Sequence, residues 1–108
     1  MLIHHVCIQT NSYELSKVFY CDLLGFQLIS ETANFHGRGY NSWLREPGGF
    51  MIELQTAKAG GQFSPACKES EGLAHLCFLV EAVTIATFPF NILFTSFLKF
   101  FLFCRFGY

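Results

Sequence analysis

Charged residues are scarce in this sequence, and no stretch of it is strongly basic. Asp, Glu, Lys and Arg make up 14% of the 108 residues, and the formal net charge is -1. Since lysine and arginine form no cluster, the sequence lacks the basic surface that nucleic-acid binding requires. The length suits one domain with its own hydrophobic core.

Acidic residues are missing altogether from residues 82–108. The only charges in this segment are Lys99 and Arg105, whereas eight of the fourteen phenylalanines lie there. Residues 82–98 carry no charge, but they fall short of the about 20 apolar residues of a membrane span and contain Pro89. Three interpretations stay open, namely a membrane anchor, a buried strand or hairpin, and an aberrant end. We favour the aberrant end, because the composition is typical of a shifted reading frame in an A/T-rich gene.

Paired cysteines and an N-terminal signal peptide are also lacking. The number of cysteines is odd, and no two of them form a Cys-x-x-Cys pair. We therefore expect reduced thiols in a cytoplasmic protein. The five cysteines are Cys7, Cys21, Cys67, Cys77 and Cys104.

A strand and a helix are predicted at the start of the chain. Residues 3–10 alternate, with positions 5, 7 and 9 on one face and positions 4, 6 and 8 on the other. A helix is predicted over residues 12–24, since Asn11 and Glu14 form a capping-box pattern and Gly25 is a natural stop. A histidine on the polar face of the strand is a candidate wall of a site, although such residues are more often structural.

Three closely spaced strands are predicted next. Their short connections favour an antiparallel meander. Strict alternation along the first strand places Leu28 and Ser30 on the same face. In the third strand, Glu53 lies on the face opposite to the one that carries the apolar residues. The three strands are expected over residues 26–32, 40–45 and 50–56.

A weak internal repeat links the two halves of the chain. After a loop over residues 57–72, a strand begins near Leu73, and its His75 and Cys77 repeat the His-x-Cys spacing of the first strand. The repeat predicts a second copy of a βαβββ unit. No helix or further strand of that copy is recognisable after Glu81. The predicted fold class is α+β, with one βαβββ module followed by the first strand of an incomplete second module.

Taken in this order, the pieces resemble the vicinal oxygen chelate superfamily, which includes glyoxalase I, bleomycin-resistance proteins and extradiol dioxygenases. The resemblance covers residues 1–81 as a glyoxalase-like domain and leaves residues 82–108 as a Phe-rich tail. It rests on His4-His5-Val6-Cys7-Ile8, Phe19-Tyr20, Leu24-Gly25-Phe26, Phe50-Met51-Ile52-Glu53-Leu54 and Leu73-Ala74-His75-Leu76-Cys77-Phe78-Leu79-Val80.

The resemblance implies paired modules that hold a divalent metal ion, one of Ni, Zn, Fe, Mn or Co. Glyoxalase I relatives bind the ion with His, Glu, His and Glu from four strands, and His5, Glu53 and His75 match the first three. It also implies that Glu53 is the catalytic base that moves a proton between adjacent carbons, while the metal stabilises the ene-diolate oxygens. Cys7 and Cys77 lie beside the histidines, and we interpret them as small core residues rather than thiolate ligands.

Two departures from the family pattern bear on the function. The fourth ligand, a Glu on the last strand, has no counterpart, because residues 82–108 contain no Glu or Asp. Gln9 stands where glutathione-dependent members often carry Arg, and a neutral amide cannot make the same charge-assisted contact. Glutathione is therefore a doubtful partner.

Three functional hypotheses follow from the resemblance. The first is a metal-dependent glyoxalase I-like (lactoylglutathione lyase-type) enzyme for a small substrate with vicinal oxygens, impaired by the missing ligand. The second is a non-catalytic ligand-binding dimer of bleomycin-resistance type, and the third is a product without function. A homodimer is expected, in which His5 and Glu53 of one chain share a site with His75 of the other. Binding to a membrane is not expected.

Overall fold

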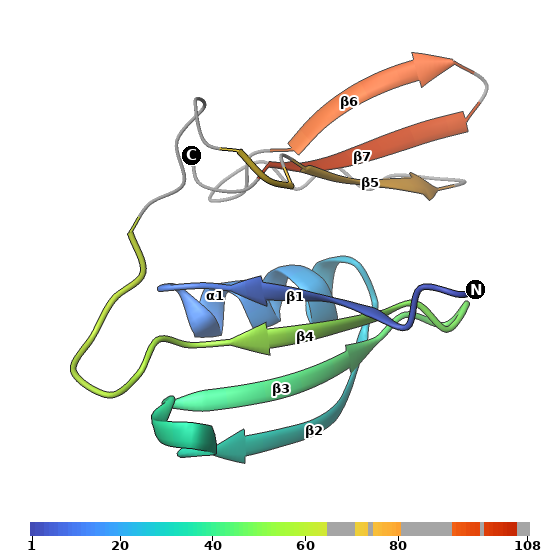
Figure 1. Ribbon diagram of the computed structural model, residues 1–108. Coiled ribbons are helices and arrows are strands. Elements are labelled where there is room, and N and C mark those ends of the chain that lie inside the picture. Colours follow the sequence, from blue (N-terminus) through green and yellow to red (C-terminus); the bar gives the residue numbers. More distant parts are fainter. Residues whose placement is uncertain (65–70, 74, 81–91, 98, 106–108) are drawn as a thin grey trace. The chain divides into compact units, whose positions relative to one another are not determined.

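The structure, a computed structural model, describes residues 1–64, 71–73, 75–80, 92–97 and 99–105. The chain divides into two compact units, Met1–Phe63 and Ser64–Tyr108 (Figure 1). In the part of the chain that is described, no helix has the length and the apolar character to cross a membrane.

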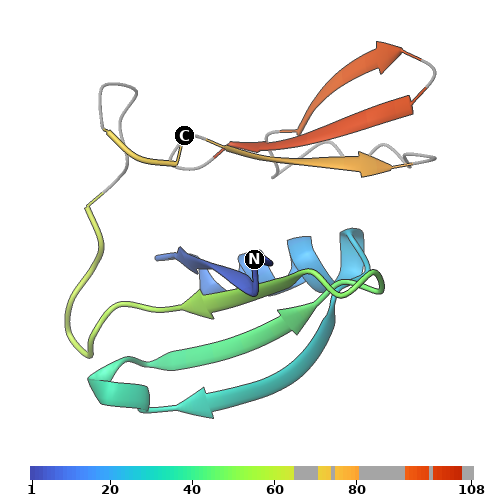
Figure 2. The same ribbon diagram turned by 45° about the vertical axis from the view of Figure 1, so that its right-hand side comes forward.

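The first unit is built on a four-stranded sheet with the order β1-β4-β3-β2. β1 runs parallel to β4, whereas β4, β3 and β2 form antiparallel pairs, which confirms the predicted βαβββ module and its meander. α1 continues directly into a π-helix, η1, and the two lie along β1 and β4 in both views (Figures 1 and 2). The elements are β1 His5–Gln9, α1 Tyr13–Lys17, η1 Val18–Leu23, β2 Gln27–Ala33, the 3-10 turn η2 Phe35–Gly37, β3 Tyr40–Arg45 and β4 Met51–Gln55.

The start of the helix differs from the predicted capping box. Ser12 is the N-cap residue and makes no side-chain capping hydrogen bond, so the pairing expected between Asn11 and Glu14 is wrong. The Asn11 carboxamide instead bonds to the backbone of Phe63, with Nδ2 donating to the carbonyl and Oδ1 accepting from the amide, each at 2.9 Å. A distant loop therefore uses the capping group that the local pattern assigned to the helix.

The end of the helix is as predicted. Gly25 has a φ of +77°, the left-handed conformation that only glycine adopts without strain, and the chain leaves the helix there. The Phe26 amide then donates to the Tyr20 carbonyl at 2.9 Å, which satisfies one of the last helical carbonyls. The prediction of a helix over residues 12–24 holds to within a residue at each end.

One face of the sheet, here called the helix face, carries the even-numbered residues of β1, β3 and β4. Leu44, Ile52 and Leu54 on this face are 0% exposed, and they form the centre of the core. Tyr13 of α1 reaches the same face, where its hydroxyl contacts that of Ser42. Burial of these side chains is the main favourable contribution to folding of the unit.

A β-bulge in β2 breaks the predicted alternation of that strand. Leu28 pairs with Leu44 and Ser30 pairs with Trp43, so Ile29 is an extra residue between them. Leu28 therefore lies on the helix face and Ser30 on the opposite one, and the prediction that they share a face is wrong. Because of the same shift, Glu31 lies opposite Ser42 on the helix face.

The second unit contains a three-stranded antiparallel sheet with the order β5-β7-β6. On β5, His75 and Cys77 are exposed while Leu76 and Phe78 are half-buried, which is the predicted alternation. No further strand was expected after Glu81, but β6 and β7 form an antiparallel pair there, so that expectation is wrong. Residues 81–91 lie outside the described residues, and the origin of residues 82–108 stays a prediction. The strands are β5 His75–Val80, β6 Ile92–Phe97 and β7 Lys99–Arg105.

Candidate functional site

The candidate site lies on the other face of the first sheet, here called the open face. It carries the odd-numbered residues of β1, β3 and β4, which the strand registers arrange in rows. Cys7, Glu53 and Trp43 form the middle row, with one residue from each of three adjacent strands. The centre of the helix face is apolar, whereas this face carries a thiol, a carboxylate and an indole side by side.

His5 and Glu53 come together on this face, across the edge strand β1 and its neighbour β4. The His5 Nε2 lies 3.5 Å from the Glu53 Oε2, and the two side chains are 34% and 16% exposed. His5 begins β1, and the parallel register brings β4 alongside it, so residues 48 positions apart in the sequence become neighbours. Two of the three predicted ligands therefore do lie side by side.

Glu53 also accepts hydrogen bonds from two neighbours. The Gln55 Nε2 donates to its Oε1 at 3.2 Å, and the Cys7 thiol donates to the carboxylate from the adjacent strand. Partial burial and the negative charge and hydrogen bonding of Glu53 raise the pKa of Cys7 to about 11, against a smaller lowering effect of Arg38. At neutral pH Cys7 is thus a protonated thiol. Cys7 and Cys77 are both exposed, so the prediction that they are small core residues is wrong.

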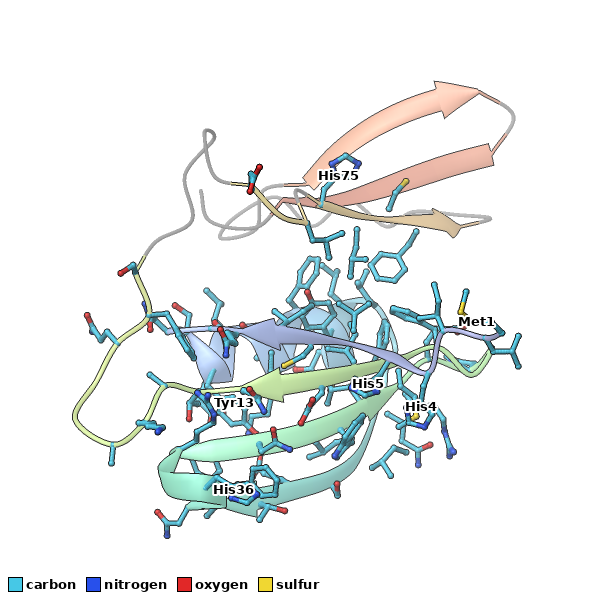
Figure 3. The ribbon with its side chains drawn as sticks, in the orientation of Figure 1. Met1, His4, His5, Tyr13, His36 and His75 are labelled. Atoms are coloured by element: carbon cyan, nitrogen blue, oxygen red, sulfur yellow. The ribbon has the colours of Figure 1, made fainter. Side chains whose placement is uncertain are left out.

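His4 and Trp43 complete the surroundings of His5. The two imidazole Nδ1 atoms are 2.8 Å apart, and the Trp43 ring lies edge-on to His5 with centroids 4.7 Å apart. The ring of His4 also approaches Trp43, at 6.2 Å, so the prediction that His4 shares the apolar face of its strand is wrong. The strand begins only at His5, and alternation does not apply before it (Figure 3). Sequence reasoning missed His4 for this reason.

His75, the third predicted ligand, belongs to the second unit and is exposed on β5 (Figure 3). Among the residues that the structure describes, no three His, Cys, Asp or Glu side chains gather as a metal site. The set of His5, Glu53 and His75 therefore stays a prediction, of which the structure brings together the first two members.

A second cluster of polar groups lies where the strands β1 and β4 end. The Arg38 Nη1 donates to the Thr56 carbonyl at 3.1 Å, and the guanidinium lies 5.8 Å from the ring centroid of Phe63. Asn41, on the open face at the start of β3, is 3% exposed, and its Oδ1 has no hydrogen-bond partner among the described residues. No sequence motif predicted this cluster, since its members come from the connection between β2 and β3, from β3 itself and from the segment after β4.

The helix face holds one polar network, and its partners are complete. The Tyr13 hydroxyl donates to the Glu31 Oε2 at 2.5 Å and contacts Ser42, while the Lys17 Nζ lies 3.0 Å from the same carboxylate oxygen. Burial and the hydrogen bond to Glu31 raise the pKa of Tyr13 to about 12. The hydrogen bonds from Tyr13 and Lys17 hold the pKa of Glu31 below its ordinary value. These groups secure the helix to the sheet.

Comparison with known proteins gives one family. The family model of the Glyoxalase/Bleomycin resistance protein/Dioxygenase superfamily matches residues 2–87, which include every helix and strand of the first unit and β5. A similar solved structure is the crystal structure of SMU.1112c, with a TM-score of 0.54 and 26% identity over 69% of this chain and 61% of that chain.

Two curated proteins are similar in sequence, and both are described as uncharacterized. YaeR of Escherichia coli (strain K12) is 36% identical over 84 residues, or 78% of this chain and 64% of that protein. YwkD of Bacillus subtilis (strain 168) is 38% identical over 81 residues, or 75% of this chain and 62% of that protein. The chain thus spans less than two thirds of the length of each curated relative.

Proposed function

The chain belongs to the Glyoxalase/Bleomycin resistance protein/Dioxygenase superfamily, and we propose that it is a metal-dependent enzyme of glyoxalase I type. Its substrate would be a small molecule with vicinal oxygens. The observation that carries the proposal is the pair of His5 and Glu53, which face each other on the open face at 3.5 Å.

The pair fits a divalent metal ion in donor type and in spacing. An imidazole nitrogen and a carboxylate oxygen suit Zn, Ni, Fe, Co and Mn alike. Two donors about 2.1 Å from one tetrahedral ion lie about 3.4 Å from each other, which is close to the observed separation. His5 and Glu53 would hold the ion, with His75 as a third ligand. A bound ion would polarise the substrate oxygens as a Lewis acid.

The residues around the pair would fix its geometry and move a proton. The hydrogen bonds from Cys7 and Gln55 hold the Glu53 carboxylate in place on the open face. From there Glu53 would accept the proton from one substrate carbon and return it to the adjacent carbon, as a general base and then a general acid. The aromatic edge of Trp43 limits the rotation of the His5 ring.

The assembly that we propose is a homodimer in the cytoplasm. His5 and Glu53 of one chain would meet His75 of the other, giving two equivalent sites across a twofold axis. Residues 1–81 would be the glyoxalase-like part, and residues 82–108 an atypical tail that lacks the fourth ligand.

A second candidate is a non-catalytic binding protein of bleomycin-resistance type. Its support is that Glu53 already has partners in His5, Gln55 and Cys7, so protein groups alone satisfy the charge of this carboxylate. Such a protein would bind its ligand in a dimer groove without a metal ion.

Metal content of the purified chain separates the two candidates. We expect close to one ion per chain, lost in His5→Ala, Glu53→Gln and His75→Ala, because each removes a ligand. His36→Asn is the matched control, since it removes an imidazole from the η2 turn, where His36 has a φ of 49° that Asn tolerates. A wild-type protein that binds no Ni, Zn, Fe, Mn or Co under any loading condition would contradict the enzyme and favour the binding protein.

A further inference from the structure

Arg38 is a part-buried cation that pairs with no carboxylate among the described residues. One of its five N–H groups donates to the Thr56 carbonyl, and the flat guanidinium lies beside the Phe63 ring. An arginine held in this way keeps an edge of donors for a further acceptor. Because a partly buried charge is costly without a counterion, the arrangement calls for an anion from outside the chain.

The position of Arg38 is fixed by contacts from several segments. A backbone bridge joins Arg38 to Lys58, which brings a second cationic residue to the same place. Phe63, which flanks the guanidinium, is held by both hydrogen bonds of the Asn11 carboxamide. Three connections of the first unit thus converge on one guanidinium, unlike a surface arginine that only solvent surrounds.

Asn41 marks the same end of the open face. It pairs with Gln55 across β3 and β4, one residue before Thr56, whose carbonyl binds Arg38. The buried Oδ1 of Asn41 has no partner among the described residues, and such an atom costs free energy until a donor reaches it. Because an anion has no proton to donate to this oxygen, Arg38 would supply the bonds to the anion, and Asn41 would bind a donor group elsewhere on the same ligand.

The distance between this end of the open face and the pair of His5 and Glu53 sets the size of the ligand. Glu53 and Gln55 are two residues apart on β4, or about 7 Å at the rise of a strand. His5 and Gln9 are four residues apart on β1, or about 13 Å. A molecule with reactive oxygens at Glu53 and an anionic end some atoms away would span the two clusters.

We propose that Arg38, with the Phe63 ring beside it, binds an anionic group of the substrate, a carboxylate or a phosphate. The assignment of the bound molecule as a substrate rests on the proposed function, whereas the anion site itself does not. Arg38 thus supplies a cation on the open face, although Gln9 is neutral. It comes from the connection between β2 and β3, whereas Gln9 lies on β1.

Binding measurements with a matched pair of 2-oxo acids test the site in the metal-loaded protein. We expect 2-oxoglutarate to bind about tenfold or more tightly than 2-oxopentanoate, which has the same carbon chain but no second carboxylate. Arg38→Gln should abolish this preference and leave the affinity for 2-oxopentanoate unchanged, and Arg38→Lys should retain part of it. Lys17→Gln is the control, since it removes an equal charge beside the helix face. An unchanged preference in Arg38→Gln would overturn the proposal.

Titration of the metal-free protein separates this proposal from the function on which it rests. Glutarate and inorganic phosphate carry the anionic group without vicinal oxygens, and amide chemical shifts report where they bind. Shifts at Arg38, Asn41 and Phe63 that vanish in Arg38→Gln would support the site, and the tighter probe would identify the group. No shifts there with either probe would overturn it, even if metal binding at His5 and Glu53 is confirmed. Shifts there in a protein that binds no metal would leave the site standing and reject the enzyme.

Discussion

The two faces of the first sheet are made from the same strands and differ in almost every physical property. On the helix face, Leu44, Ile52 and Leu54 are 0% exposed and closely packed. On the open face, alternate residues of the same strands include His5 and Glu53, which keep 34% and 16% of their side chains exposed. In β1, β3 and β4 the even-numbered residues thus form the core, and the odd-numbered residues carry the proposed site.

The polar groups of the two faces also differ in how fully they are satisfied. On the helix face, Tyr13, Ser42, Glu31 and Lys17 bond to one another and complete their network. On the open face, the Asn41 Oδ1 has no partner among the described residues. A closed network holds a structure together, whereas unfilled bonding capacity is what a ligand requires.

The largest effect is expected from a change in the helix-face core. Leu54→Ala should lower the free energy of unfolding by about 2–5 kcal/mol, because it leaves a cavity in the packed core that the neighbouring side chains do not fill. Glu53→Gln, a change of the adjacent residue on the open face, should change it by about 0.5 kcal/mol or less, although it removes a proposed metal ligand. Chemical denaturation of both variants measures the difference. Equal losses would mean that the open face is also part of the core.

A smaller effect is expected from the network beneath the helix. Tyr13→Phe should cost about 1–2 kcal/mol, since the change leaves Ser42 and Glu31 without the buried hydroxyl. The folded state raises the pKa of Tyr13 from 10.0 to about 12, so it favours the neutral phenol. Wild-type stability should therefore fall as the pH rises from about 10 to about 12, and Tyr13→Phe should remove this fall. Thermal unfolding at pH 9 and pH 11 is the measurement, and a parallel decline in both proteins would contradict it.

The smallest effect is expected from the acid side of the same network. The folded state lowers the pKa of Glu31 below its ordinary value of 4.5, so its contribution is present above that pH and is lost as the pH falls below it. Glu31→Gln should reduce stability by less than about 1 kcal/mol at pH 7 and by less at pH 3, because partly exposed ion pairs contribute little. Glu14→Gln, which removes the other carboxylate beside Lys17, is the control and should change stability less at both values.

Alternation of side chains predicted most of the first unit from the sequence. Local periodicity predicts the order of the elements and the division of β4 into an apolar and a polar face. The backbone preference of glycine predicts the end of the helix at Gly25. The same periodicity places His5 and Glu53 each on the polar face of its own strand. Only the resemblance to the vicinal oxygen chelate superfamily suggests that the two side chains meet. Their meeting depends on the pairing of β1 with β4, which joins distant parts of the chain.

The parts that could not be predicted depend on contacts between distant residues. Asn11 has the right type and position for a capping box, but Phe63, 52 residues away, bonds to its carboxamide. Arg38 lies in the connection between β2 and β3, which has no motif, and the chain brings Thr56 and Phe63 to it only on folding. Local patterns cannot show whether Asn11 bonds to the helix start or to the Phe63 backbone, since its carboxamide can form hydrogen bonds with either.

The bulge at Ile29 has a consequence for the evolution and engineering of this strand. Leu28 pairs with Leu44 and Ser30 with Trp43, which are consecutive residues of β3. Two consecutive residues of a regular strand would pair with them in the same way. Deleting Ile29 would therefore shorten the chain by one residue and leave every side chain of β2 on its present face. A strand interior normally tolerates no such deletion, because a one-residue slip inverts its faces. This position can absorb a change in length that would disrupt any of the other strands of the sheet.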